Sequence, residues 1–141
     1  MNTTEKNTIQ SIYPAVRYQD AKKAIAWLKS ALGFAEHVVY EGDGGRIEHA
    51  QLQLAGNLIM LGSEKTDCYG SSPRSLGGTT GTIYIALESP AQIDECYERA
   101  KAAGAEIVRE LGDTDYGSHD FGVRDLEGHI WSFGTYRPQA T

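Results

Sequence analysis

The sequence has few basic residues and no long apolar run. Its thirteen Lys and Arg residues against nineteen Asp and Glu give a formal net charge of -6 over 141 residues. Non-specific binding to nucleic acid or to an anionic membrane needs a surplus of positive charge, so we expect neither as a partner. The longest apolar runs have four or five residues, which is too short for a transmembrane helix.

Cysteine is also scarce, and no targeting segment is visible. Cys68 and Cys96 form neither a CxxC pair nor a disulfide framework. Residues 1–10 are polar and lack the apolar stretch of a signal peptide, so we expect a cytoplasmic protein. Hydrophobic residues make up 40% and charged residues 23%, which is typical of a globular chain. We therefore predict a single domain over residues 1–141 with a core of its own.

Hydrophobic periodicity divides the chain into two halves of the same layout. In the first half, Asp20 is a helix N-cap and Gly33 a helix end in the left-handed conformation. Alternating segments predict strands over 11–18, 35–40, 46–54 and 58–62. In the second half, Ser89 and Pro90 start a helix that Gly104 closes. Its predicted strands cover residues 82–87, 106–111, 118–123 and 130–136.

A nearly constant offset relates the two halves. Tyr13 and Tyr84 are 71 residues apart, as are Gly33 and Gly104, while His49 and His119 are 70 apart. We interpret this as an internal duplication of a βαβββ unit, with module 1 over 11–63, a linker over 64–81 and module 2 over 82–136. The Ser-, Gly- and Pro-rich linker is the best candidate for a mobile loop. Each half is too small to bury its sheet alone, so the modules must pack together, within one chain or between two.

The layout resembles the glyoxalase/bleomycin-resistance/dioxygenase family, the vicinal oxygen chelate superfamily. The strongest match is YGSHDFGVRDLEGH at residues 116–129, which is similar to the family signature G-x-x-x-F-x-V-x-D-P-x-G-N. Leu126 replaces its usual Pro, and His129 its usual Asn. The resemblance implies an α+β fold in which two tandem βαβββ modules form a curved mixed sheet with a concave ligand cavity. It also implies a homodimer with grooves at the subunit interface.

Enzymes of that family bind a divalent metal through a residue near the start of each module's first strand and another in each last strand. In this sequence those positions fall on Tyr13, Met60, Tyr84 and Ser132. None is a good donor to a hard or borderline metal ion. We therefore expect no metal and no other cofactor, and we favour a protein that is not an enzyme.

Two histidines leave an alternative open. His49 and His119 correspond under the repeat, so they could lie close together and build a non-standard metal site. That site would suit a glyoxalase-like lyase or isomerase, or a dioxygenase. The sequence also has no G-x-S-x-G nucleophile motif.

Strand alternation predicts what lines the cavity. The predicted ligand-binding residues are Tyr13, Arg17, His49, Gln51, Met60, Tyr84, Phe121 and Ser132. Aromatic rings, a thioether and hydrogen-bonding groups suit a planar or amphipathic organic molecule. The leading hypothesis is thus a metal-free, small-molecule-binding protein similar to the bleomycin-resistance members, which sequester a toxic compound. The competing interpretation is that these side chains only fill the mouth of the fold or a dimer interface.

Overall fold

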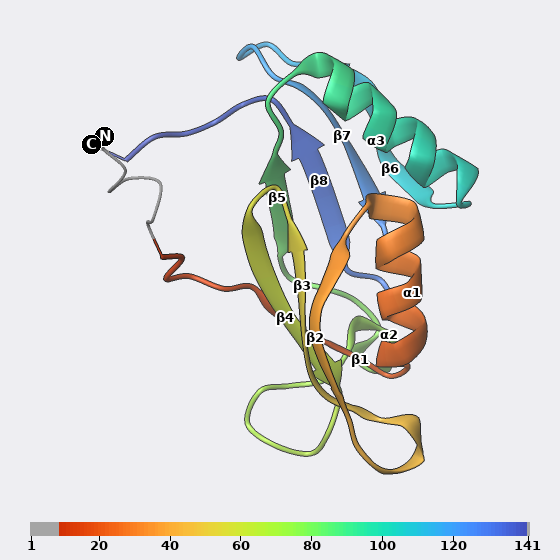
Figure 1. The fold of residues 1–141 in the computed structure, drawn as a ribbon. Helices are drawn as coiled ribbons and strands as arrows, with labels where there is room; N and C mark the ends of the chain where they lie inside the picture. Colours follow the sequence, from red (N-terminus) through yellow and green to blue (C-terminus); the bar gives the residue numbers. More distant parts are fainter. Residues whose placement is uncertain (1–8, 141) are drawn as a thin grey trace.

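Each half of the chain forms its own four-stranded sheet, and the computed structural model describes residues 9–140 (Figure 1). The elements of module 1 are β1 (Ala15–Tyr18), α1 (Ala21–Leu32), β2 (Ala35–Glu41), β3 (Ile47–Leu54) and β4 (Asn57–Ser63). After the short helix α2 (Pro73–Leu76), module 2 has β5 (Thr82–Ala86), α3 (Pro90–Ala102), β6 (Glu106–Asp113), β7 (His119–Arg124) and β8 (Ile130–Gly134). Among the described residues, no helix has the length and apolarity needed to cross a membrane.

The two sheets share one topology. Their strand orders are β1-β4-β3-β2 and β5-β8-β7-β6, with β1–β4 and β5–β8 parallel and the other pairs antiparallel. This confirms the α+β class and the repeated βαβββ unit. The strands divide between two sheets, in contrast to the single continuous sheet expected from the sequence.

The residues predicted to begin and end the helices do so in the structure. The Asp20 side chain accepts a hydrogen bond from Lys23 N at 3.1 Å, and Ser89 does the same for Gln92 N at 3.3 Å. Each cap satisfies a donor that the first helical turn leaves unpaired. Gly33 ends α1 with a φ of 84°, a left-handed backbone that glycine adopts without steric cost.

One hydrophobic core joins both modules. Helices α1 and α3 pack against each other, and the helix-facing side chains of both sheets close around them. The Phe34 ring meets Trp131 edge to face at 5.5 Å, which brings the two modules together. Within residues 9–140, no helix of either module covers the opposite face of its sheet, and we call this the open face of that module.

Phe121 belongs to this core, so its expected place in the cavity is wrong. It is fully buried between Tyr97 and Phe133, with ring centroids 5.3 and 5.2 Å away. The reason is the strand register, because Phe121 stands opposite Phe133, and side chains opposite each other in a ladder share a face. Phe133 faces the helices, so Phe121 does too.

The first strand is shorter than predicted. It begins at Ala15, while residues 11–14 lie outside the ladder. Pro14 has no N–H to donate, and its carbonyl accepts from Met60 N at 2.9 Å, so regular pairing starts after it. Upstream, the Gln10 side chain accepts from Leu58 N at 2.7 Å and donates to Leu58 O at 2.9 Å.

This register also corrects the expected correspondence between the modules. Ala15 pairs with Met60, and Tyr84 pairs with Ser132. The structural counterpart of Tyr84 is therefore Ala15, and Tyr13 precedes the strand. The offset is 69 residues in the first strands and 72 between Met60 and Ser132, so the 71-residue repeat is an average over both.

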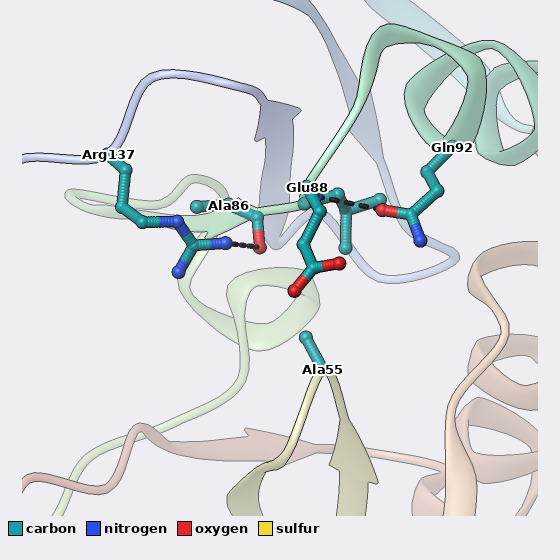
Figure 2. A pocket seen from close by; sticks show the side chains of 6 residues that line it. Ala55, Ala86, Glu88, Gln92 and Arg137 are labelled. Atoms are coloured by element: carbon teal, nitrogen blue, oxygen red, sulfur yellow. Dashed lines mark hydrogen bonds between the residues drawn. The ribbon is translucent and has the colours of Figure 1, made fainter. Parts of the chain in front are cut away.

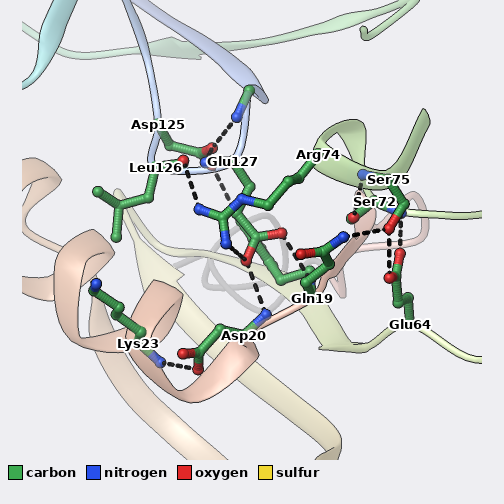
Figure 3. A network of polar contacts seen from close by, with 12 residues as sticks. Gln19, Asp20, Lys23, Glu64, Ser72, Arg74, Ser75, Asp125, Leu126 and Glu127 are labelled. Carbon is green, nitrogen blue, oxygen red and sulfur yellow. Dashed lines mark hydrogen bonds and ion pairs between the residues drawn. The ribbon is translucent and has the colours of Figure 1, made fainter. Parts of the chain in front are cut away.

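A buried carboxylate in the β7–β8 connection joins the modules (Figure 3). Asp125 Oδ2 accepts from the Tyr18 hydroxyl at 2.6 Å and from the Trp131 indole N–H at 3.0 Å. Its Oδ1 accepts from the backbone N–H groups of residues 127, 128 and 129 at 3.0 to 3.1 Å. One side chain thus holds its own turn and reaches β1 of the other module.

Glu127 makes a second connection from the same turn. Its carboxylate accepts from Gln19 N at 2.7 Å and Asp20 N at 2.8 Å, just before α1 (Figure 3). Arg74 of α2 lies 3.6 Å from the same carboxylate. The sequence signature at residues 116–129 therefore fastens module 2 to the start of the module 1 helix.

The linker is more structured than a plain loop. Ser72 caps α2 by accepting from Ser75 N, and Glu64 accepts from Ser72 N at 2.7 Å and from the Ser75 hydroxyl at 2.6 Å. These hydrogen bonds lower the pKa of the Glu64 carboxyl, the Ser75 contact most strongly. The linker is therefore fixed at Glu64 and again at α2.

The β3–β4 turn contains the one described non-glycine residue with a positive φ. Ala55 has a φ of 54° and is followed by Gly56 at 78°. Two-residue hairpin turns of this kind favour Asn or Gly at both positions. Because a left-handed alanine costs roughly 1 kcal/mol, we predict that Ala55→Asn raises the unfolding free energy by up to about 1 kcal/mol. Gly56→Ala should lower it by a similar amount; urea unfolding measures both, and a loss with Asn would contradict the assignment.

Candidate functional site

The open face of module 1 contains a cavity of about 400 Å³. Its floor comes from three adjacent strands, β1, β3 and β4, and one wall comes from the linker. The lining residues are Ala15, Val16, Arg17, Glu48, His49, Met60, Leu61, Gly62 and Tyr69. Three of the predicted site residues, Arg17, His49 and Met60, thus meet around one cavity.

Arg17 is held in place by the linker. Its guanidinium donates to both oxygens of Asp67, at 3.1 and 2.9 Å, in a bidentate pair. It also lies over the Tyr69 ring, 5.7 Å from the centroid. The hydrogen-bonded Arg17 lowers the pKa of the Asp67 carboxyl, and Asp67 in turn raises the pKa of Arg17. Asp67 therefore compensates the positive charge of Arg17 beside the cavity, and the contact between Arg17 and the Tyr69 ring places Tyr69 at the edge of the cavity.

A row of hydrogen-bonded side chains borders the cavity along β3 and β2. The Gln51 amide nitrogen lies 3.1 Å from His49 Nε2, and the Gln51 oxygen lies 2.9 Å from His37 Nδ1. Gln51 therefore connects the rings of His49 and His37 through its two side-chain polar atoms. The Tyr40 ring stacks on His49 with centroids 6.3 Å apart. Gln51 therefore positions His49 without lining the cavity itself.

Tyr84 and Ser132 lie on the other open face. They are paired in the β5–β8 ladder of module 2, and neither lines the cavity of module 1. The Tyr84 hydroxyl donates to the Tyr136 carbonyl at 2.6 Å, and burial is the main cause that raises its pKa. The Tyr136 ring meets Tyr116 edge to face at 5.5 Å. Module 2 thus presents its own tyrosine-rich surface.

Tyr13 contributes to neither face. Its hydroxyl donates to the Gln10 carbonyl at 2.7 Å, upstream of β1. Two contributors to the cavity, Asp67 and Tyr69, were missed from the sequence. The only signal was an aromatic residue in a Ser- and Gly-rich linker, and the pairing of Arg17 with Asp67 fifty residues away is a tertiary contact.

Comparison with known proteins gives the family. The sequence model of the Glyoxalase/Bleomycin resistance protein/Dioxygenase superfamily matches residues 10–133. The chain belongs to this superfamily. The uncharacterised protein Rv0887c of Mycobacterium tuberculosis is 33% identical over 136 residues, covering 94% of this chain and 78% of that protein. The uncharacterised protein Mb0911c of Mycobacterium bovis is 34% identical over 131 residues, covering 91% and 84%.

Solved structures share the superfamily fold. TioX from Micromonospora sp. ML1 superposes with a TM-score of 0.71 at 30% identity, over 94% of this chain and all of that one. FosX of Listeria monocytogenes, a fosfomycin resistance protein solved in complex with Mn(II) and sulfate, gives 0.64 at 17% identity over 92% and 95%. At that identity FosX supports the fold alone.

The metal positions that the superfamily's enzymes use do not fit a metal in this chain. Tyr13 lies upstream of β1, and in the observed register Ala15 takes its expected place opposite Met60, where its methyl side chain has no ligand atom. Tyr84 donates its hydroxyl hydrogen to the Tyr136 carbonyl, and a thioether and a serine hydroxyl occupy the other two positions, Met60 and Ser132. Hard and borderline divalent ions prefer carboxylate and imidazole ligands. Within residues 9–140, no three His, Cys, Asp or Glu side chains are grouped so as to hold an ion.

The alternative site around His49 and His119 is wrong in geometry. His49 lines the open face of module 1, whereas His119 lies on the helix side of β7, in step with the buried Phe121. There His119 contacts Asp113 of β6 at 2.8 Å and Asp94 of α3 at 2.7 Å. The reason is the offset: Gln51 pairs with Met60 as Gly122 pairs with Ser132, so the structural counterpart of His49 is Asp120, and His119 faces the opposite side of its sheet.

The His119 contacts predict a pH-dependent stability. Hydrogen bonds to Asp94 and then Asp113 raise the pKa of His119 from its ordinary value of 6.5. Because the pKa of His119 is higher in the folded than in the unfolded protein, protonated His119 stabilises the fold. This stabilisation is complete below about pH 6.5, the unfolded pKa, and is lost as the pH rises through the folded-state pKa. We expect the difference in unfolding free energy between the wild type and His119→Gln to shrink from pH 6 to pH 9. Urea titrations at each pH measure it, and a constant difference would contradict the assignment.

Proposed function

We propose that the chain binds a small organic molecule on the open face of module 1 and that binding requires no metal ion. The carrying observation is the convergence of Arg17, His49, Met60 and Tyr69 on one cavity of about 400 Å³. That volume lies within the usual range for small-molecule sites, which is roughly 300–1,000 Å³.

The lining chemistry favours a planar, amphipathic ligand. Tyr69, with 79% of its surface exposed, offers a free aromatic face, and Met60 offers a polarisable thioether. His49 adds a polar contact with its orientation fixed by Gln51. Such a set suits capture of a ring system better than chemical conversion of it. Sequestration of an antibiotic or other toxic compound is the function that this arrangement supports best.

Equilibrium dialysis against a panel of planar natural products tests the proposal. We expect Tyr69→Ala to weaken binding of any ligand found by about tenfold, as expected from losing an aromatic contact of about 1 kcal/mol or more. Tyr116→Ala is the matched control, because it removes an exposed tyrosine of module 2, and it should leave binding unchanged. Binding should also survive treatment with EDTA. No binding across the panel, or loss of binding with EDTA, contradicts the proposal.

We extend the proposal to a homodimer in which the groove lies at the subunit interface. The support is the superfamily resemblance and the lack of a covering helix on either open face. Light scattering coupled to size exclusion measures the mass directly. A mass of one chain at about 100 µM, where a moderately tight dimer with a Kd of about 1 µM is nearly saturated, would exclude this assembly.

A further inference from the structure

A separate cavity of about 310 Å³ lies between the two modules (Figure 2). Module 1 contributes only the tip of its β3–β4 turn, Ala55. Module 2 contributes the end of β5, the first turns of α3 and the segment after β8. The lining residues are Ala55, Ala86, Leu87, Glu88, Gln92 and Arg137, none of which lines the open-face cavity of module 1.

Opposite charges line this cavity without neutralising each other. Among residues 9–140, neither Glu88 nor Arg137 takes part in an ion pair, and the Glu88 carboxylate accepts no hydrogen bond. Within the same described range, the Arg137 side chain donates one hydrogen bond, from Nη2 to the Ala86 carbonyl at 3.4 Å. Figure 2 shows the carboxylate directed toward Ala55 and the guanidinium next to the Ala86 carbonyl. The cavity therefore offers an anion and a cation to a ligand at the same time.

Gln92 adds an oriented donor. Its side-chain oxygen accepts from Glu88 N at 2.8 Å, which turns the amide NH₂ group away from that contact. Figure 2 shows this nitrogen on the cavity side. The Gln92 amide therefore offers the ligand a hydrogen-bond donor on the other side of Glu88 from the Arg137 guanidinium.

A second hollow with a partly apolar lining adjoins this cavity. A neighbouring hollow of about 260 Å³ shares Ala55, Leu87 and Gln92 with it. The other lining residues of that hollow are Leu32, Leu54, Cys96 and Phe133 together with the charged Glu95 and Arg99. Burial raises the pKa of the Cys96 thiol to about 11, so it is a neutral, weakly polar group at neutral pH. An apolar side chain entering from the charged cavity would meet the apolar part of this lining, which includes Leu54 and Leu87.

The strained Ala55 lies at the junction of these spaces. Its methyl group lines both hollows, whereas the turn itself would be served better by Asn or Gly. Strained residues tend to be retained where they shape a site. This observation is independent of the charges and points to the same place.

We propose that the intermodule cavity binds a small zwitterion with an apolar side chain, either a free amino acid or a short peptide. The ammonium group pairs with Glu88, the carboxylate pairs with Arg137, and the side chain enters the hollow beside Leu54 and Leu87. The site does not depend on the proposed function of the open face, since the two cavities share no residue.

Titration of the full chain with L-leucine and with leucyl-leucine, followed by amide NMR shifts, tests the proposal. Ligand at about 10 mM nearly saturates a site with a Kd of about 1 mM. Shifts should centre on residues 86–92 and on Ala55. Isopentylamine lacks the carboxylate and N-acetyl-leucine lacks the ammonium, so each should bind about tenfold more weakly or worse. Tighter binding of leucine would identify the ligand as a free amino acid, and tighter binding of leucyl-leucine would identify it as a short peptide.

Charge-removing variants complete the test. Glu88→Gln and Arg137→Gln should each weaken zwitterion binding about tenfold, and both side chains are exposed, so the fold should persist. The controls Glu98→Gln on α3 and Lys23→Gln on α1 make the same charge changes elsewhere and should have no effect. Equal binding of all four ligands, unchanged affinity in both cavity variants, or no zwitterion binding would each overturn the proposal. Loss of binding with Tyr69→Ala would move the site to the open face and overturn it as well.

Discussion

Asp125→Asn is expected to lower the free energy of unfolding by about 2–4 kcal/mol, the range for leaving buried polar groups unpaired. The wild-type carboxylate accepts five hydrogen bonds, from Tyr18, Trp131 and three consecutive backbone N–H groups. An amide has one oxygen and one NH₂ group in the same space. If the oxygen keeps the three backbone donors, the NH₂ group faces Trp131.

The two partners of that NH₂ group respond differently. The Tyr18 hydroxyl can rotate and become the acceptor, whereas the indole N–H of Trp131 can only donate. The substitution therefore leaves the indole donor buried and unpaired. The opposite amide orientation would place the NH₂ group against three N–H donors, which is worse.

Urea unfolding followed by circular dichroism measures the effect. Asp115→Asn is the matched control, because it makes the same charge change at an exposed residue of the β6–β7 turn. We expect it to change the free energy of unfolding by no more than about 0.5 kcal/mol. A double-mutant cycle with Tyr18→Phe should show coupling, because the two side chains share one hydrogen bond. Equal stability losses in the Asp125 and Asp115 variants would refute the role assigned to the buried carboxylate.

Phe121→Ala should lower the unfolding free energy by about 3–5 kcal/mol, the usual range for truncating a buried phenylalanine. The ring is fully buried and packs between Tyr97 and Phe133, so its removal leaves a void that rigid neighbours fill only partly. Phe121→Leu keeps most of the volume and should cost less than half as much. Thermal and urea unfolding rank the variants.

The same residue separates the two interpretations of its position. A phenylalanine that lined a ligand cavity would affect ligand affinity more than stability. Because Phe121 lies in the core, we expect Phe121→Ala to reduce stability more than it reduces ligand affinity, measured at temperatures where the variant is folded. A stability loss below about 1 kcal/mol for Phe121→Ala, typical of a partly exposed position, would contradict the core assignment.

Local signals predicted most of the fold. The caps at Asp20 and Ser89, the glycine that ends α1 and the alternating strands depend on neighbours in sequence, so they were visible without the structure. The family signature at residues 116–129 was also visible. Its physical role was not, because the donors to Asp125 and Glu127 include groups of β1 and of the entry to α1, about a hundred residues away.

The errors about the predicted site concern strand register and the faces of the strands. A shift of one residue in a strand exchanges its two faces. Phe121 and His119 were therefore placed on the wrong side of β7, and Tyr13 was matched with Tyr84 in place of Ala15. Of the predicted site residues, Arg17, His49 and Met60 meet around the cavity, while Tyr69 enters it from a linker whose path no local pattern encodes.

The buried Trp131 gives the protein an optical reporter of how its halves dock. The chain has two tryptophans, and Trp131 is fully buried against Phe34 of module 1, while Trp27 lies partly exposed on α1. An indole removed from water emits at shorter wavelength and is shielded from soluble quenchers. Separation of the modules would expose Trp131 even if both sheets stayed intact. In a Trp27→Phe background, a red shift that precedes the loss of circular dichroism would reveal undocking as a step distinct from unfolding.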